Sequence, residues 1–378
     1  MEKKKLLFVY YKMNRAGGIN RVLTDLVNAV SVDYDITILL LMSAHKPFYE
    51  LRPEVKLEFV DAFHHWAFRK VCVWLDRYMR WLPFRDKLKF YLYDFGAYKT
   101  LDKWMDTHGG DYDTIISCMY KLSAGLSINK KVNYKTIGWE HNNFRGGGWL
   151  WGSLRKNYSK KLKAVVAITA QAQDYFRSLG ANTKLIYNLM NDEVYQLPFK
   201  PVEEKKNQIV FAANLHPEKN VMGFLRIIQQ VDLPKDWTVK LIGDGIQMGW
   251  VENFIKENQL QQQVHLLGKV PFDEVMQNMA ESKIFCLTSV NEPFGLVLIE
   301  AMFNSCVLLA YDCEHGPAEI INQNNGFLIP LHDENCYVEV LRDLISNPGL
   351  IKKINRSVYQ DAKKWQKRGG LKQWEEIL

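Results

Sequence analysis

Residues 284–302 have the sequence IFCLTSVNEPFGLVLIEAM. The apolar run at its start predicts a buried strand, Ile284–Thr288. Pro293 and Gly295 indicate a loop that leads into a helix, and the apolar residues after them continue that helix. A buried strand, a short loop and a helix in this order form the repeating unit of a doubly wound α/β domain.

Two glutamates, Glu292 and Glu300, are separated by seven residues across this loop and helix. The first N–H groups of a helix, here those of Gly295, Leu296 and Val297, favour an anion such as a diphosphate. One carboxylate can accept hydrogen bonds from sugar hydroxyls and the other from a ribose diol. The pattern therefore suits a nucleotide diphosphate sugar. On spacing alone, a solvated loop acid and a helix surface charge remain the alternative.

The same alternation of strands and helices runs from end to end, so we predict an α/β protein. The expected strands are Leu6–Tyr11, Ile36–Leu41, Lys56–Val60, Thr114–Ser117, Thr136–Trp139, Val165–Ile168, Lys184–Tyr187, Ile209–Ala213, Thr238–Ile242, Val264–Leu266, Ile284–Thr288, Val307–Ala310 and Gly326–Ile329. Continuous apolar runs between helices indicate parallel strands buried on both faces. We expect two Rossmann-like domains, 1–192 and 193–357, that face each other across a cleft holding the active site. A polar, proline-bearing linker is expected near 190–207, and a C-terminal helix of about 358–378 is expected to pack back on the first domain.

Composition and charge narrow the class of protein. With 378 residues, 47% hydrophobic and 24% charged, the chain is neither disordered nor low-complexity. No apolar run reaches the length of a membrane span, and six scattered cysteines form no Cys-x-x-Cys pair, which favours a reducing cytoplasm. Residues 1–200 hold 31 Lys and Arg against 19 Asp and Glu, whereas the rest of the chain is mildly acidic. The basic half indicates an anionic partner.

A pair of glycines, Gly17 and Gly18, follows the first expected strand. Glycine allows a backbone to approach a phosphate closely at a helix start, although a tight strand-to-helix turn explains the pair equally well. The loop lacks the Gly-x-Gly-x-x-Gly pattern of dinucleotide-binding proteins. A nicotinamide enzyme is therefore disfavoured and is kept as a third hypothesis.

With these residues in place, the chain resembles the retaining GT-B glycosyltransferases, most closely family 4, also called glycosyl transferases group 1. Glu292 to Leu296 with Glu300 resembles the Glu-x7-Glu motif of that family. Further similar segments are Gly17–Arg21, Ala212–Asn220, Leu241–Gly245, Gly268–Val270, Asp312–Ile321 and Asn325–Ile329. The resemblance implies the two-domain GT-B fold.

The resemblance also implies a donor site. In it, Lys219 binds the diphosphate, Glu300 the ribose and Glu292 the sugar, while the backbone at Lys269 and Val270 holds the base. The full implied set of donor-binding residues is Gly17, Gly18, Asn214, Lys219, Lys269, Val270, Glu292, Phe294, Gly295, Leu296, Val297 and Glu300.

The implied catalytic residues are His141, Glu292 and Lys219, with the histidine contacting the reacting sugar or the acceptor. Asn214 stands where the family usually has arginine, so one cation for the leaving diphosphate is missing. Arg15, Arg21 or Arg145 are candidate replacements. The substitution also keeps open an alternative, a catalytically weak homologue that binds nucleotide sugar or serves as a partner subunit.

Metal chemistry is not expected. Asp33-Tyr34-Asp35 and Asp111-Tyr112-Asp113 have the Asp-x-Asp pattern of a different glycosyltransferase fold, but both precede apolar strands. We expect strand-start turns there, with no metal and no cofactor. The resemblance implies a retaining, metal-independent hexosyltransferase that uses a nucleotide diphosphate sugar, expected to be UDP-linked. The expected acceptor is lipid-linked or a glycan, in the synthesis of a surface polysaccharide such as capsule or O-antigen.

Residues 64–104 hold nine Lys and Arg and twelve aromatic residues. Val71, Trp74, Leu75, Tyr78 and Leu82 share one helical face, whereas the face opposite carries Arg69, Arg77 and Arg80. This pattern is typical of an interfacial helix on an anionic membrane, and residues 145–163, rich in tryptophan, arginine and lysine, form a second expected patch. Alternatively, the apolar face packs on the sheet of the first domain. Nucleic-acid binding is not expected, because no nucleic-acid-binding motif accompanies the aromatics. The protein is thus expected in the cytoplasm, on the inner face of the plasma membrane.

Overall fold

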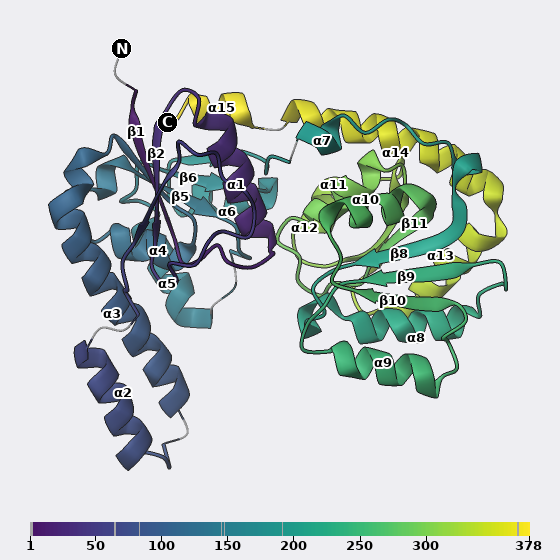
Figure 1. The fold of residues 1–378 in the computed structure, drawn as a ribbon, viewed down its shortest axis with the longest axis horizontal. Coiled ribbons are helices and arrows are strands. Elements are labelled where there is room, and N and C mark those ends of the chain that lie inside the picture. The colour runs from purple at the N-terminus through teal and green to yellow at the C-terminus, as the bar shows by residue number, and fades with distance from the viewer. Residues whose placement is uncertain are drawn as a thin grey trace. The chain divides into compact units, whose positions relative to one another are not determined.

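The computed structural model describes residues 3–63, 66–82, 84–144, 146, 148–190, 192–368 and 370–378. The chain forms two compact units, one of residues 1–189 with 370–378 and the other of residues 190–369. Each unit is a parallel sheet with helices between its strands (Figure 1). The predicted α/β class and the two doubly wound sheets are confirmed, and every expected strand occurs within three residues of its expected ends.

The first unit contains a seven-stranded sheet in the order β3-β2-β1-β4-β5-β6-β7. Its strands are β1 (Lys5–Tyr10), β2 (Asp35–Leu40), β3 (Lys56–Phe59), β4 (Thr114–Ser117), β5 (Thr136–Glu140), β6 (Ala164–Ala167) and β7 (Thr183–Leu185). Its helices are α1 (Gly18–Val30), α2 (Trp66–Tyr78), α3 (Arg85–His108), α4 (Tyr120–Leu126), α5 (Gly148–Tyr158), α6 (Ala170–Ser178) and α15 (Leu371–Glu375). The order of the strands reverses between β1 and β4, which marks the carboxyl ends of these strands as the place for a ligand.

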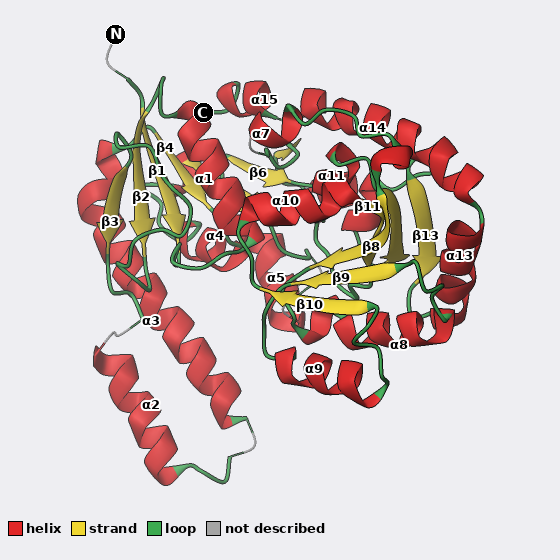
Figure 2. Cartoon of the chain, turned by 45° about the vertical axis from the view of Figure 1, so that its right-hand side comes forward, coloured by secondary structure: helices red, strands yellow, loops and turns green. Residues whose placement is uncertain are grey.

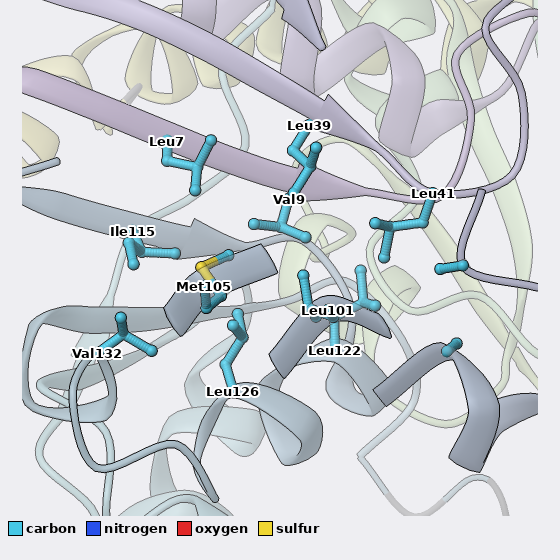
Figure 3. Close-up of a cluster of buried hydrophobic side chains, with 12 residues drawn as sticks. Leu7, Val9, Leu39, Leu41, Leu101, Met105, Ile115, Leu122, Leu126 and Val132 are labelled. Atoms are coloured by element: carbon cyan, nitrogen blue, oxygen red, sulfur yellow. The ribbon is translucent and has the colours of Figure 1, made fainter. Parts of the chain in front are cut away.

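We had expected every strand to be buried on both faces, and β3 of this sheet departs from that expectation. All four residues of β3 are exposed, because β3 is an edge strand that pairs only with β2. The interior of the sheet has the expected character: Leu7 and Val9 of β1 pack with Leu101 and Met105 of α3 in one buried cluster (Figure 3). The second half of α3 is therefore part of the core of the unit.

The helices α2 and α3 form a hairpin, in which the buried residues of α2 are Cys72 and Leu75. Figures 1 and 2 both show α2 and the first turns of α3 extending away from the seven-stranded sheet. The alternative of an apolar face of α2 packed on the sheet is thus not what the structure shows. Val71, Trp74 and Tyr78 are exposed.

The second unit contains a six-stranded sheet in the order β10-β9-β8-β11-β12-β13. Its strands are β8 (Lys206–Ala212), β9 (Thr238–Ile242), β10 (Val264–Gly268), β11 (Ser282–Leu287), β12 (Val307–Asp312) and β13 (Gly326–Pro330). Its helices are α7 (Asp192–Tyr195), α8 (Val221–Val231), α9 (Met248–Glu257), α10 (Phe272–Glu281), α11 (Leu296–Phe303), α12 (Gly316–Ile320), α13 (Glu334–Ser346) and α14 (Pro348–Arg368). Here the order reverses between β8 and β11, again a switch point for a ligand.

The C-terminal helix is divided differently from the expectation. α14 packs on α11 within the second unit, with Val358 and Ala362 fully buried, and only residues 370–378 join the first unit. There Trp374 of α15 is buried against Trp139 of β5, with ring centroids 4.8 Å apart.

The expected linker near 190–207 also differs, because its backbone carbonyls accept hydrogen bonds from α14 of the second unit. Tyr359 of α14 donates from its hydroxyl to the carbonyl oxygen of Leu197 at 2.6 Å. Asn355 of the same helix donates to the carbonyl oxygen of Lys200 at 3.3 Å. The segment also contains the short helix α7 and the first residues of β8, so it belongs to the second unit and is not a free linker.

Candidate functional site

Three loops meet at the carboxyl edge of the six-stranded sheet. The backbone N–H of Val290, after β11, donates to the carbonyl oxygen of Glu218, after β8, at 2.8 Å. The N–H of Gly316, after β12, donates to the carbonyl oxygen of Glu292 at 2.9 Å. The Thr288 hydroxyl adds a bond of 3.0 Å to the carbonyl oxygen of Asn220. These bonds fix the loop of Lys219 beside the loop of Glu292.

Lys219 and Glu292 form an ion pair at this edge. The Lys219 Nζ and Glu292 Oε2 atoms lie 2.6 Å apart, and the Ser289 hydroxyl donates a hydrogen bond of 3.2 Å to the same carboxylate oxygen. The side chains are 18% and 12% exposed, so both charges are mostly removed from water while remaining within reach of a ligand. The lysine predicted for the diphosphate and the glutamate predicted for the sugar are therefore brought together.

Two glycines allow the Glu292 loop to take this path. Gly295 precedes α11 with φ +94°, a left-handed conformation that side chains other than glycine rarely adopt. A Cβ on Gly316 would lie 2.5 Å from the carbonyl oxygen of Glu292, too close for any other residue. The resemblance placed Gly316 only in a closing segment; its steric role in supporting Glu292 depends on the tertiary structure.

The helix α11 begins next to this ion pair. Leu296 and Val297 stand in its first turn, where N–H groups have no partner within the helix, and Glu300 follows half-exposed in the second turn. The Phe294 side chain is buried against Trp365 of α14, with centroids 5.8 Å apart, so its ring belongs to the core. Only the backbone of Phe294 remains available for the predicted donor contact.

The other predicted donor residues of this unit follow neighbouring strands at the same edge. Asn214 is exposed after β8, and Lys269 and Val270 follow β10. The N–H of Gly243 donates to the carbonyl oxygen of Gly268 at 2.8 Å, which joins the ends of β9 and β10. The positions fit a base and diphosphate site along one edge, and the assigned roles stay predictions.

In the first unit, the glycine loop leaves space in front of its backbone. Gly17 precedes α1 with an extended φ of 171°, which any residue adopts, and a Cβ on it would meet nothing within 4 Å. The turn therefore does not require glycine at this position, which favours the ligand interpretation over the tight-turn interpretation. Of the cations considered as replacements for the missing arginine, Arg21 pairs with Asp25 at 3.1 Å, and Arg145 lies outside the described residues.

His141 follows β5 at the carboxyl edge of the seven-stranded sheet. The residue is 6% exposed, and its Nε2 is buried without a hydrogen-bond partner among the described residues. Its ring lies 4.2 Å from the ring of Trp139, which in turn packs on Trp374. Burial lowers the pKa of His141 to about 3. An unpaired, neutral imidazole nitrogen is ready to accept or donate a hydrogen bond to a ligand hydroxyl.

We expect His141 to stay neutral throughout the physiological range. Its NMR Cε1 shift should not change between about pH 5 and 8, because burial disfavours the charged imidazolium. Between the folded pKa of about 3 and the ordinary value of 6.5, only the unfolded chain binds the proton, so this group lowers stability as the pH falls through that window. The signal is assigned with His141→Gln. A shift that titrates near 6.5 would contradict a buried, neutral His141.

Glu140 and Arg155 form a buried polar network beneath the histidine loop. Glu140 Oε1 accepts from Tyr158 at 3.1 Å and from Ser123 at 3.2 Å. Burial raises the pKa of Glu140 to about 7, against the opposing pull of the Arg155 cation. Arg155 donates to the carbonyl oxygen of Gly146 at 2.6 Å, within the loop that follows His141. The sequence analysis missed this network; a glutamate at the end of an apolar strand, directly before a candidate histidine, was the available signal.

This network corrects the prediction of a second membrane patch over residues 145–163. Arg155 and Trp151 are buried, and Arg155 lies over the ring of Tyr120 at 4.5 Å. The helical spacing of α5 placed them on the core side, which composition could not show. Lys156, Lys160, Lys161 and Lys163 are exposed. Gly147, like Arg145, lies outside the described residues, and the side chain of Trp149 is not described.

The two Asp-x-Asp segments form strand-start turns, as expected. Asp35 begins β2 and pairs with Lys56 at 2.9 Å, while Asp113 accepts from the backbone N–H of Lys5 at 2.8 Å. No group of three or more His, Cys, Asp or Glu side chains within the described ranges is placed to hold a metal ion. Independence from a metal stays a prediction. In the part of the chain that is described, no helix combines the length and apolarity that crossing a bilayer requires.

Comparison with known proteins agrees with this geometry. Residues 196–365, nearly all of the second unit, match the model of the family described as glycosyl transferases group 1. The chain is 24% identical over 383 residues to GalNAc-alpha-(1->4)-GalNAc-alpha-(1->3)-diNAcBac-PP-undecaprenol alpha-1,4-N-acetyl-D-galactosaminyltransferase of Campylobacter jejuni, covering 99% of this chain and 98% of that protein. It is also 24% identical to the amylovoran biosynthesis glycosyltransferase AmsD of Erwinia amylovora, over 99% of both chains.

Among solved structures, HepE of Anabaena in complex with UDP superposes with a TM-score of 0.73 at 17% identity, covering 98% of each chain. This likeness concerns the fold. Together with the two parallel sheets, whose strand order reverses near the middle, it shows that the chain has the GT-B fold. The family match shows that residues 196–365 form a glycosyl transferases group 1 domain.

Proposed function

We propose that this protein is a retaining glycosyltransferase that moves a hexosyl unit from a nucleotide diphosphate sugar, UDP-linked, to a lipid-linked or glycan acceptor in surface polysaccharide synthesis. The observation that carries the proposal is the Lys219–Glu292 pair beside the first turn of α11. A cation and free helix N–H groups suit a diphosphate, and an adjacent carboxylate suits sugar hydroxyls. The undecaprenol-linked substrate in the name of the Campylobacter relative supports the acceptor class.

The chemistry follows from the groups present. The bond between the anomeric carbon and the diphosphate oxygen breaks, and the acceptor hydroxyl bonds to the same face of the sugar. The departing phosphate oxygen takes the proton of that hydroxyl. Lys219 and the first N–H groups of α11 stabilise the charge that develops on the diphosphate, the type of stabilisation that usually contributes most to catalysis. Glu292 holds the sugar hydroxyls and is not required as a nucleophile. No step in this scheme uses a metal or cofactor.

A donor screen tests the proposal. The protein is incubated with a panel of nucleotide sugars and lipid-linked acceptors, and the released nucleoside diphosphate is measured. We expect turnover with one UDP-sugar and a product with the anomeric configuration of the donor, established by NMR. Turnover with an inverted product would overturn the retaining mechanism. Absence of release with every donor, together with measurable donor binding, would instead support the second candidate, a catalytically weak nucleotide-sugar-binding homologue, which the exposed Asn214 favours.

Glu300→Ala should weaken donor binding far more than acceptor binding. A charge-assisted hydrogen bond to the ribose diol is worth about 1.5–3 kcal/mol, so we expect the KM for the donor to rise roughly 10- to 150-fold while the KM for the acceptor changes little. Glu252→Ala, at an exposed glutamate of α9, is the matched control. An equal rise of both KM values, or an unchanged donor KM, would remove the ribose assignment.

A further inference from the structure

The helical hairpin made by α2, the first part of α3 and the turn between them, residues 66–99, carries a concentration of exposed apolar side chains. Ten of the twenty exposed large apolar side chains in the described residues fall between positions 66 and 95. They are Trp66, Val71, Val73, Trp74, Tyr78, Trp81, Phe84, Leu88, Tyr91 and Phe95. Exposed apolar residues scattered singly need no explanation, but a concentration of this size marks an interaction surface.

The apolar side chains are ordered by the helices. On α3, the exposed positions Leu88, Tyr91 and Phe95, with Phe84 immediately before the helix, have the spacing i, i+4, i+7 and i+11, which places them in one stripe. On α2, Trp74 and Tyr78 are one turn apart, with ring centroids separated by 6.1 Å. The hairpin therefore buries only a narrow seam between its helices and leaves broad outer faces uncovered.

Cations are interleaved with these side chains, and the acids are already paired. Residues 66–99 contain eight Lys and Arg against three Asp. Asp76 pairs with Lys89 at 2.7 Å, Asp86 pairs with Arg85 at 3.2 Å, and Asp94 is buried with Lys121 at 2.7 Å. Among the described residues, no ion pair joins an acid to the exposed cations of this hairpin, which are Arg69, Lys70, Arg77, Arg80, Lys87 and Lys99.

We infer that the hairpin is a membrane-binding element that docks on an anionic lipid surface, with Trp81 and Phe84 at its tip entering the boundary between headgroups and acyl chains. Trp and Tyr favour that boundary because an apolar ring and a polar N–H or O–H are both satisfied there. Uncompensated cations beside them add attraction to anionic headgroups. A protein partner is less favoured, because the cations would need matching acids at six separate positions.

The geometry of the hairpin supports insertion by the tip. Trp81 and Phe84 are 73% and 66% exposed and stand at the turn between the two helices. The other end of α3 is anchored in the core through Leu101 and Met105 (Figure 3). Figures 1 and 2 show the end of α2 and the start of α3 at the part of the hairpin that is farthest from the sheet. A rigid helix that is fixed at one end can carry an apolar tip into a bilayer without unfolding the unit.

This inference rests on the proposed function only for the lipid nature of the acceptor, so it is tested without catalysis. The whole chain is floated with vesicles of phosphatidylcholine alone and with vesicles that also contain phosphatidylglycerol. We expect binding to the anionic vesicles only, and weaker binding as the salt concentration rises. Failure to bind anionic vesicles, or equal binding to both kinds, would overturn the inference.

Variants separate the tip from the cations. The pair Trp81→Ser and Phe84→Ser should lower the vesicle partition coefficient by about tenfold, because the buried apolar area is lost. The triple change Arg77→Gln, Arg80→Gln and Lys87→Gln should lower it by about 100-fold. All five side chains are exposed, so the substitutions should leave the stability of the fold unchanged.

The matched control changes exposed apolar residues of the second unit, Ile246→Ser with Trp250→Ser, which are 71% and 63% exposed. This control should bind vesicles like the unaltered protein. Equal loss in the control, or full binding by the hairpin variants, would assign the lipid contact to another surface. A dimer that dissociates in the Trp81→Ser, Phe84→Ser variant would show that the hairpin binds a second copy and would overturn the inference.

Donor cleavage distinguishes this inference from the proposed function. If vesicle binding fails while nucleoside diphosphate is still released with a soluble acceptor analogue, the hairpin inference is wrong and the glycosyltransferase proposal stands. If vesicle binding behaves as expected while no donor is cleaved, the proposed function is wrong and the membrane contact stands.

Discussion

Lys219→Ala should lower kcat by about 100- to 1,000-fold while leaving the protein folded. Removal of one preorganised donor to a developing oxyanion costs on this order, and Lys219 is the side chain that we propose for the diphosphate. Its pair with Glu292 is mostly but not fully buried, so its loss should lower the free energy of unfolding by about 1–3 kcal/mol, between the values for exposed and for buried ion pairs. The measurements are the initial rate at saturating donor and a urea unfolding curve.

Two further variants make the Lys219 result specific. Lys235→Ala removes an exposed lysine of the same unit and should leave kcat unchanged. Glu292→Gln also breaks the ion pair but keeps the cation, so it should raise the KM for the donor through the sugar hydroxyls. If Lys219→Ala turned over at the normal rate, the diphosphate assignment would be lost. If it unfolded, Lys219 would be structural.

Arg155→Met should lower the free energy of unfolding of the first unit by about 3–5 kcal/mol at about pH 8. Arg155 is 1% exposed and its charge lowers the pKa of the buried Glu140, so its removal leaves a buried carboxylate without the cation that stabilises its charged form. The methionine keeps much of the side-chain volume, so the cost reflects charge more than a cavity. Chemical denaturation followed by tryptophan fluorescence gives the number.

The pH dependence of the stability loss in Arg155→Met shows whether the charge of Arg155 causes that loss. The pKa of Glu140 is raised to about 7 in the folded protein from an ordinary 4.5, so its contribution to stability falls as the pH rises through this window. At about pH 5 the folded carboxyl is mostly protonated and needs no cation, so Arg155→Met should cost much less there. Lys156→Met, at the exposed neighbour, should cost little at either pH. Equal losses at both pH values would mean that Arg155 acts through packing alone.

The position of Arg155 shows where composition misleads. The basic and aromatic residues of 145–163 and of 64–104 gave the same expectation of a membrane patch. In α5, Trp151 and Arg155 are one turn apart on the face that meets Glu140 and Tyr120, so they are buried. In α2, Trp74 and Tyr78 are also one turn apart, but on a face that nothing in the described first unit covers. Equal spacing had opposite outcomes because only the fold determines which helix face meets a sheet.

The candidate donor site likewise has features that the sequence predicted and features that only tertiary contacts decided. Alternating apolar runs and glycine-bearing loops were enough to place the strands of both sheets, because buried parallel strands leave a strong local pattern. The Glu292 and Lys219 positions followed from a resemblance that spans most of the chain. The distance of 2.6 Å between Lys219 Nζ and Glu292 Oε2 could not be predicted in this way. It depends on the three loops that the backbone hydrogen bonds of Gly316 and Val290 hold together.

The sequence by itself thus determined the α/β class and the parallel strands, because both leave their mark within a few neighbouring residues. The chemistry of the candidate site was predicted through the family resemblance. The tertiary structure alone decided that Lys219 meets Glu292, that Arg155 is buried near Glu140, that residues 370–378 return to the first unit, and that the hairpin stands uncovered. Those outcomes depend on contacts between residues far apart in the chain, and such contacts form only when whole elements pack and exclude water.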